Sequence, residues 1–297
     1  MSLSLLGAFT ALVTPFVAET GEVDQAAYDA LCERQITGGI AGLVPCGTTG
    51  ESPTLTDEEQ AELVRRAVAI SRGRVPVIAG TGSFSTKKTI ESSKRALEAG
   101  ADAVMIVMPY YSKPSQEGLF QHLTTVARAV GAPIVLYNIP GRTQVDLSVE
   151  TTARICEASP NVVATKEATG NILRAQELKR VLGDRLTVLS GDDGLTLGMM
   201  AVGAAGVISV TSNLYPDKVS EVVRLAASGR SADALRAHQR LLPVHDAMFL
   251  DANPGPAKAV LAAKGQMSRH TRLPLMPPNE AIIARVLETV RAYEAAL

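Results

Sequence analysis

One lysine of this chain stands directly at the end of an apolar run. Lys166 follows Val162-Val163-Ala164-Thr165, and a poorly hydrated amine at such a position loses its proton readily and becomes a nucleophile. A structural lysine paired with Glu167 or another carboxylate is the alternative that position alone leaves open. Lys113 lies in a loop. The remaining lysines lie in or near helical segments and are expected to be solvated: Lys87, Lys88, Lys94, Lys179, Lys218, Lys258 and Lys264.

Hydroxyl groups follow three other apolar runs. Schiff-base chemistry on a lysine needs groups that carry protons to and from the carbinolamine and enamine. Tyr137, Tyr111 and Thr48 supply such hydroxyls. Tyrosine more often packs as an aromatic with a polar tip, but three of the six tyrosines stand at these ends, Tyr110 being the third. The pattern therefore favours proton transfer.

Two segments are suited to binding carboxylates. Gly47-Thr48-Thr49-Gly50-Glu51-Ser52, hereafter the 47–52 loop, offers backbone N–H groups and hydroxyls, although a plain tight turn explains its glycines almost as well. Arg142 lies in a loop flanked by proline and glycine, where a guanidinium binds a carboxylate with two hydrogen bonds. A surface arginine is an equally good interpretation of Arg142.

Other reactive side chains are assigned structural roles. The four histidines show no metal-ligand spacing, and we expect no metal site. Asp192 and Asp193 are expected to cap a helix beginning at Gly194 rather than to bind a cation. Cys46 is expected to be a buried, apolar thiol.

The elements that must position these residues repeat one pattern, a short apolar run followed by a loop and a longer amphipathic segment. The runs lack clean alternation, as strands buried on both faces do. Eight strands are predicted, at residues 8–13, 42–45, 75–79, 103–107, 134–137, 162–165, 186–189 and 206–209. Helices are predicted between and after them, at residues 57–71, 87–99, 116–130, 148–158, 171–182, 194–202, 217–228, 232–249, 257–264 and 279–296.

Eight such repeats indicate an α/β fold, the (β/α)₈ TIM barrel with a C-terminal helical extension. A doubly wound open sheet is the alternative, but a nucleotide-binding version should carry G-x-G-x-x-G after its first strand, where Thr14-Pro15-Phe16 stands instead. We predict a catalytic barrel over residues 1–228 and a helical region over residues 229–297. Because barrel active sites lie at the C-terminal ends of the strands, the residues above should share one site.

Composition excludes several classes of partner. The 29 basic and 30 acidic residues give a net charge of −1 without long runs of one sign, so nucleic acid is not an expected partner. No apolar stretch is long enough for a membrane span, and no signal peptide is indicated. Three widely spaced cysteines predict a reducing compartment, and we expect a cytoplasmic protein.

Four motifs at the predicted strand ends follow one another along the chain. They are the 47–52 loop, Tyr110-Tyr111, Tyr137-Asn138-Ile139-Pro140-Gly141-Arg142-Thr143 and Lys166-Glu167-Ala168-Thr169-Gly170. In this order they resemble the dihydrodipicolinate synthase (4-hydroxy-tetrahydrodipicolinate synthase) family of Schiff-base aldolases. The resemblance covers nearly the whole chain, including Asn253-Pro254-Gly255-Pro256.

The resemblance implies a lyase of lysine and diaminopimelate biosynthesis. It condenses pyruvate, held as an imine on Lys166, with L-aspartate 4-semialdehyde, and it needs no metal or organic cofactor because the imine is the electron sink. Family membership further implies a homotetramer in which Tyr111 is shared across a subunit interface. The implied proton relay is Thr48, Tyr137 and Tyr111.

Four further positions match substrate-binding residues of the family. Thr49 and Ile208 correspond to pyruvate-binding positions, Gly191 lines the site, and Arg142 receives the carboxylate of aspartate semialdehyde. The chain departs from the family at its lysine-inhibition site, where Asp57, Gln60, Phe84 and Lys88 stand at positions that hold His, Asn and Glu in regulated members. Lys88 would repel the amino group of lysine, so we predict weak or absent inhibition.

Two rival functions remain at this point. A sister aldolase acting on N-acetylneuraminate or on 2-keto-3-deoxy sugar acids would use the same imine, but Arg142 in its Gly-Arg-Thr pattern argues against a neutral sugar chain. An inactive barrel that binds a metabolite is the non-enzymatic alternative. The joint presence of Lys166, Tyr137, Thr48 and Arg142 speaks against it.

Overall fold

Eight parallel strands form the barrel. The structure, a computed structural model, describes residues 3–297. Its strands hydrogen-bond in the order β2-β1-β8-β7-β6-β5-β4-β3, and a parallel bridge between Leu43 and Val77 closes the ring between β2 and β3. The strands are β1 (Gly7–Ala11), β2 (Gly42–Val44), β3 (Ile78–Gly80), β4 (Ala103–Val107), β5 (Ile134–Asn138), β6 (Val162–Glu167), β7 (Thr187–Ser190) and β8 (Gly206–Ser209). The predicted barrel is confirmed, and the open doubly wound sheet is wrong.

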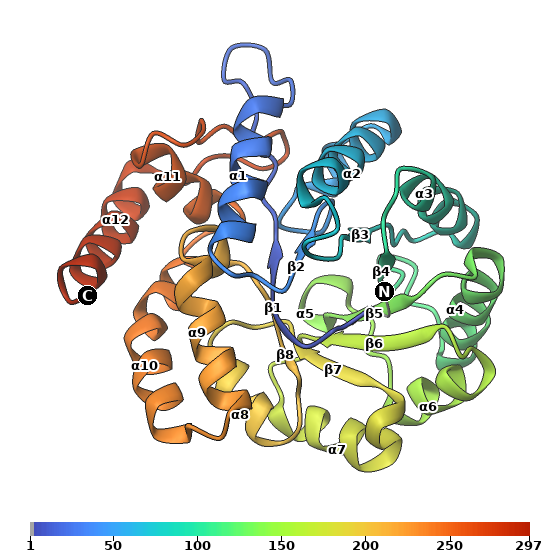
Figure 1. Ribbon diagram of the computed structural model, residues 1–297. Coiled ribbons are helices and arrows are strands. Elements are labelled where there is room, and N and C mark those ends of the chain that lie inside the picture. Colours follow the sequence, from blue (N-terminus) through green and yellow to red (C-terminus); the bar gives the residue numbers. More distant parts are fainter. Residues whose placement is uncertain (1–2) are drawn as a thin grey trace.

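Helices surround the strands (Figure 1). Those of the barrel are α1 (Gln25–Thr37), α2 (Asp57–Ser71), α3 (Thr86–Glu98), α4 (Gln116–Val130), α5 (Pro140–Thr143), α6 (Val149–Ala158), α7 (Ile172–Leu182), α8 (Thr196–Ala201) and α9 (Pro216–Ala227). Three 3₁₀ turns, η1 (Ser52–Thr54), η2 (Gly183–Arg185) and η3 (Thr211–Asn213), complete this part. The C-terminal helices are α10 (Ser231–Ala247), α11 (Gly255–Ala263) and α12 (Glu280–Ala295).

Local signals fix several helix ends. Thr56 accepts from the N–H of Glu59, whose carboxylate accepts from the N–H of Thr56, so the predicted capping box begins α2. Gly131, with φ of 68°, ends α4 in the left-handed conformation that glycine adopts without strain. Helix α1 was not predicted because its buried face includes the polar Gln35, which accepts a hydrogen bond from Thr10 Oγ1 at 2.7 Å.

The strands bury side chains on both faces. A core inside the barrel contains Phe9, Ile78, Met105, Val135 and Leu189, and a second core lies between the strands and the helices. The second core extends without interruption to Val244, Val260 and Val286 of the C-terminal helices. These helices therefore share the packing of the barrel, while the division at residue 228 stays a prediction.

No helix within residues 3–297 combines the length and the apolar composition that a membrane crossing requires.

Candidate active site

Lys166 and Tyr137 lie side by side at the C-terminal ends of β6 and β5. They are register partners in adjacent parallel strands, and the Lys166 Nζ lies 4.3 Å from the centre of the Tyr137 ring. Both side chains are buried. Because side chains alternate along a strand, Lys166 lies on the same face as Ala164, which belongs to the core inside the barrel together with Tyr137.

Glu167 does not neutralise Lys166. Its carboxylate accepts hydrogen bonds from Thr169 N at 2.7 Å and Asn138 Nδ2 at 3.3 Å, and no ion pair to Lys166 occurs among the described residues. The alternative of a lysine paired with this carboxylate is therefore wrong. Burial raises the pKa of Glu167, against the effect of these hydrogen bonds, so its proton is held more tightly than that of an exposed glutamate.

The neighbouring strand ends are fixed by a polar network. Asn138 donates to Asp146 Oδ1 at 2.9 Å and accepts from Leu147 N at 3.1 Å. Arg174 binds Asp146 through two nitrogens, at 3.2 and 2.6 Å. Since Asn138 and Glu167 directly follow Tyr137 and Lys166, this network sets the orientation of the two reactive side chains.

Gly191 lies against the lysine side chain, and Ile208 lies in the core inside the barrel. A Cβ atom on Gly191 would lie 3.2 Å from Lys166 Cε and 2.6 Å from the Cβ of Ala168, so a side chain at this position would displace the lysine. Ile208, on β8, is 1% exposed and belongs to the same inner core as Tyr137. Gly191 directly follows β7, and Ile208 lies within β8, inside the strand predicted over residues 206–209.

The 47–52 loop presents donors without protein partners. Within residues 3–297, the backbone N–H groups of Thr48 and Thr49 donate to no protein acceptor, whereas those of Gly50 and Glu51 bond to Gly47 O and Thr48 O. The side chain of Thr49 is buried, and its hydroxyl accepts from Asn253 Nδ2 at 3.0 Å. Two adjacent free N–H groups suit an anionic oxygen.

Lys258 is not solvated, contrary to the sequence prediction. It is fully buried and pairs with Glu51 of the 47–52 loop at 2.7 Å. Burial lowers the pKa of Lys258 to about 8, although the charge of Glu51 opposes the shift. The sequence does indicate this burial, because Lys258 is the single charged residue between Pro254 and Ala263.

Arg142 and Tyr111 are exposed. Arg142 lies on the short helix α5, not in a loop, and its guanidinium forms no ion pair among the described residues. Tyr111 is 93% exposed and has a left-handed backbone with φ of 73°. The structure therefore brings Tyr111 into no packed contact with the barrel of its own chain.

The expected helix cap at Asp192 and Asp193 is absent, whereas the expected burial of Cys46 is present. Asp193 caps no helix: its Oδ2 accepts from Val210 N at 2.8 Å and Thr211 N at 3.1 Å, which fixes the segment after β8, while Asp192 accepts from Gly194 N ahead of α8. The predicted cap is wrong. Cys46 is buried as expected, and burial raises the pKa of its thiol to about 12.

The four side chains of the expected lysine-inhibition site already make contacts within the chain. Asp57 pairs with Arg95 at 2.7 Å, and Gln60 donates to Ser52 O at 3.1 Å. The Lys88 Nζ lies 5.9 Å from the centre of the Phe84 ring. Phe84 packs edge-on against Tyr110, with 5.5 Å between ring centres.

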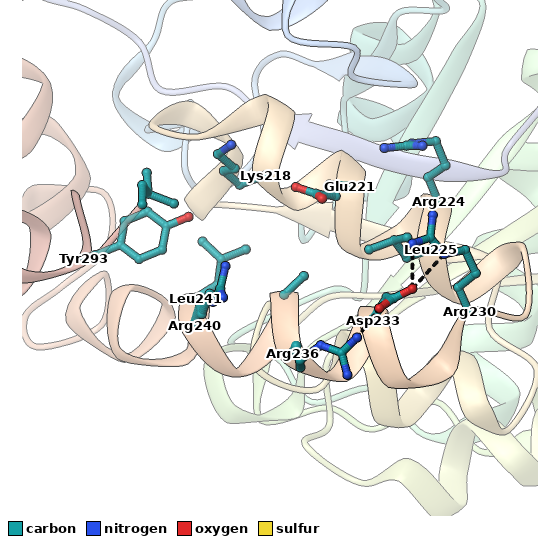
Figure 2. Close-up of a pocket in the computed structure, with 12 residues that line it drawn as sticks. Lys218, Glu221, Arg224, Leu225, Arg230, Asp233, Arg236, Arg240, Leu241 and Tyr293 are labelled. Atoms are coloured by element: carbon teal, nitrogen blue, oxygen red, sulfur yellow. Dashed lines mark hydrogen bonds and ion pairs between the residues drawn. The ribbon is translucent and has the colours of Figure 1, made fainter. Parts of the chain in front are cut away.

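A charged cleft of about 380 Å³ lies away from these residues, between α9 and α10 (Figure 2). Asp233 pairs there with Arg230 and Arg236. Lys218, Glu221 and Arg224 of α9 also line it, and Tyr293 of α12 lies at one end. No residue of the predicted active site lines this cleft.

Comparison with known proteins decides the family. The sequence profile of the Dihydrodipicolinate synthetase family matches residues 4–293. The chain belongs to this family. A 4-hydroxy-tetrahydrodipicolinate synthase from Sorangium cellulosum is 64% identical over 293 residues, which span 99% of this chain and 97% of that protein.

Solved structures of the family agree with the fold. The 4-hydroxy-tetrahydrodipicolinate synthase from Methylacidiphilum fumariolicum is 43% identical, with a TM-score of 0.96 over 98% of this chain and 97% of that chain. A dihydrodipicolinate synthase from Acinetobacter baumannii, complexed with pyruvate, is 39% identical, with a TM-score of 0.96 over 98% and 99% of the two chains. These relatives favour the synthase over the sugar-acid aldolases and over an inactive barrel.

Proposed function

We propose that this chain is a 4-hydroxy-tetrahydrodipicolinate synthase that condenses pyruvate with L-aspartate 4-semialdehyde. Membership of the family and 64% identity to a protein of that name support the reaction. The single structural observation that carries the assignment of residues is the buried, unpaired amine of Lys166 beside the Tyr137 ring. A buried amine without a carboxylate partner is suited to attack a ketone.

In the first half-reaction, the Lys166 amine adds to the keto carbon of pyruvate. Loss of water from the carbinolamine gives a protonated imine, and loss of a methyl proton then gives the enamine. The imine nitrogen accepts the electron pair of the broken C–H bond, so the lysine serves as the electron sink and no cofactor is required. Tyr137 and Thr48 carry the protons.

The carboxylate of pyruvate is bound by the 47–52 loop. The free N–H groups of Thr48 and Thr49 are its donors, and Thr49 is held in place by Asn253. Ile208 bounds the methyl side, and Gly191 leaves room beside the lysine chain. Thr48, Thr49, Gly191 and Ile208 thereby hold the keto acid close to the amine, which lowers the entropic cost of the first step.

In the second half-reaction, the enamine carbon attacks the aldehyde. Its C–C bond forms as the aldehyde oxygen takes up a proton, and the substrate amine then displaces Lys166 from the imine carbon and closes the ring. Arg142 binds the carboxylate of the semialdehyde through its exposed, unpaired guanidinium. This contact distinguishes the reaction from that of aldolases that act on neutral sugar chains.

The proposed enzyme is a homotetramer in the cytoplasm. Tyr111 completes the proton relay of a neighbouring subunit, which accounts for a large aromatic side chain that is 93% exposed on a left-handed backbone. Three unpaired, buried cysteines fit a reducing compartment.

Borohydride reduction in the presence of pyruvate tests the central assignment. We expect one pyruvate-derived adduct on the peptide that contains Lys166, detected by mass spectrometry. Lys166→Ala should lose the adduct and remain folded, while Lys94→Ala, which removes an exposed lysine of α3, should keep it. An unmodified Lys166 in the wild type would refute the assignment.

A second assay separates the substrates. Consumption of L-aspartate 4-semialdehyde with pyruvate is compared with cleavage of N-acetylneuraminate and of a 2-keto-3-deoxy sugar acid. We expect turnover of the semialdehyde alone. Preferential cleavage of a sugar acid would leave the imine chemistry intact and overturn the second substrate.

A further inference from the structure

Glu51 and Lys258 form an ion pair with both side chains fully buried. Their charged atoms lie 2.7 Å apart. The second carboxylate oxygen of Glu51 accepts from the backbone N–H of Arg272 at 3.0 Å, and the Lys258 Nζ lies 4.3 Å from the centre of the Phe16 ring. The pair therefore joins the 47–52 loop to α11 of the C-terminal region.

Stability alone does not explain this arrangement. Taking two charges out of water costs about as much as their attraction returns, and well-packed apolar side chains of similar size often stabilise a core more. Glu51 is also a non-glycine residue with φ of 55°, a left-handed conformation that a side chain disfavours. Two unfavourable features at one buried residue indicate that its carboxylate holds the neighbouring backbone in a particular conformation.

The feature fixed by Glu51 is the path of the loop beside it. The N–H of Glu51 donates to Thr48 O at 3.1 Å, and Thr14 Oγ1 donates to Gly50 O at 2.7 Å. The loop is thus held by Thr14, in the segment that follows β1, and by Lys258 of α11. The N–H groups of Thr48 and Thr49, which donate to no protein acceptor within residues 3–297, directly precede these attachments at Gly50 and Glu51.

We propose that Glu51 and Lys258 are positioning residues that hold the N–H groups of Thr48 and Thr49 toward the carboxylate of the keto acid bound at Lys166. This inference rests on the proposed function and deepens it. It gives the C-terminal region a role in substrate selection, because α11 supplies the lysine. Neither Glu51 nor Lys258 touches the reacting atoms.

The test compares pyruvate with its methyl ester, which has the same ketone without the negative charge. Borohydride trapping at Lys166 is measured against the concentration of each compound, and the ratio of the two half-saturating concentrations gives the selectivity for a carboxylate. The variants are Glu51→Gln, Lys258→Met and the double variant that combines them. The double variant leaves no unpaired charge in the core and is the decisive one.

Glu59→Gln is the matched control. Glu59 binds the Arg272 guanidinium at 2.7 and 2.6 Å, so this variant weakens the same corner of the molecule without touching Glu51 or Lys258. We expect the selectivity for pyruvate to fall at least tenfold in the double variant and to stay within twofold of the wild type in the control. Trapping of the methyl ester should change little in both.

Failure of the positioning role and failure of the proposed function would give different results. Selectivity within twofold of the wild type in the double variant, or an equal loss of trapping for both ketones, would overturn the positioning role and leave the proposed function standing. Absence of trapping of either ketone by the wild type would refute the proposed function itself.

Discussion

Lys166 and Tyr137 are register partners on β6 and β5, and the lysine amine lies 4.3 Å from the centre of the tyrosine ring. The two residues are 29 positions apart in the sequence and meet because their strands are adjacent and parallel. This contact places the Tyr137 ring directly beside the lysine amine. The position of the lysine side chain depends in turn on its neighbour Gly191.

Gly191→Ala should displace the lysine. The added Cβ would lie 3.2 Å from Lys166 Cε and 2.6 Å from the Cβ of Ala168. Overpacking of this kind costs about 1–3 kcal/mol of stability, and a misplacement of about 1 Å lowers a catalytic rate roughly a hundredfold. Denaturant unfolding and the rate of pyruvate trapping measure the two effects.

Gly141→Ala is the control for this variant, because a Cβ at that position meets no atom within 4 Å. It should retain the wild-type stability and trapping rate. A Gly191→Ala enzyme that traps pyruvate at the wild-type rate would contradict the crowding argument.

Arg142→Ala should impair the second substrate only. Hydrogen bonds to a charged group contribute about 1.5–3 kcal/mol, which corresponds to roughly a 10- to 150-fold loss of kcat/KM for aspartate semialdehyde. Pyruvate trapping should remain unchanged. Arg128→Ala, which removes an exposed arginine of α4, should affect neither measurement.

Mixing two inactive variants should restore activity if Tyr111 acts across an interface. Lys166→Ala subunits keep an intact Tyr111, and Tyr111→Phe subunits keep an intact lysine. In a hybrid oligomer, the lysine of a Tyr111→Phe subunit and the Tyr111 of a neighbouring Lys166→Ala subunit together form a complete site. Steady-state assays after dissociation and reassembly of the mixture measure the gain, and a mixture no more active than its components would show that Tyr111 serves its own chain.

Stability should fall as the pH decreases from about 6.5 toward about 4, partly because of His122. Burial lowers the pKa of His122 from 6.5 to about 4, and its Nδ1 hydrogen-bonds with Thr86 Oγ1 at 2.8 Å. The unfolded chain therefore binds a proton in this range that the folded chain rejects, and protonation favours unfolding.

His122→Asn retains a polar partner for Thr86 and removes the titration. The midpoint of denaturant unfolding at pH 7 and at pH 5 should differ less in this variant than in the wild type. An equal difference in the two proteins would show that His122 does not contribute.

Lysine should inhibit the enzyme weakly or not at all. Lys88 places a positive charge in the expected inhibition site that would repel the amino group of lysine, and Asp57 is already paired with Arg95. Initial rates with increasing L-lysine test this prediction. Inhibition at submillimolar concentration would show that the site binds lysine despite these changes.

The sequence by itself determined the barrel and singled out Lys166 as a candidate nucleophile. The eight predicted strands are short apolar runs, and a strand buried on both faces must have this composition whatever its neighbours are. Lys166 was identified by the same reasoning, since it ends one of these runs. Arg142 was likewise a candidate from its place after a predicted strand, whereas Thr49 and Gly191 were assigned only through the family resemblance.

Only the tertiary structure decided which residues contact one another across the chain. Lys258 has the spacing of an ordinary helical residue, and its burial depends on Glu51, which lies 207 positions away. Asp193 resembled a helix cap because sequence shows only local donors, whereas the N–H groups it accepts from lie 17 and 18 residues further on. Local sequence patterns indicate which side chains a segment buries, whereas the packing of the whole chain, C-terminal helices included, determines which buried charges meet.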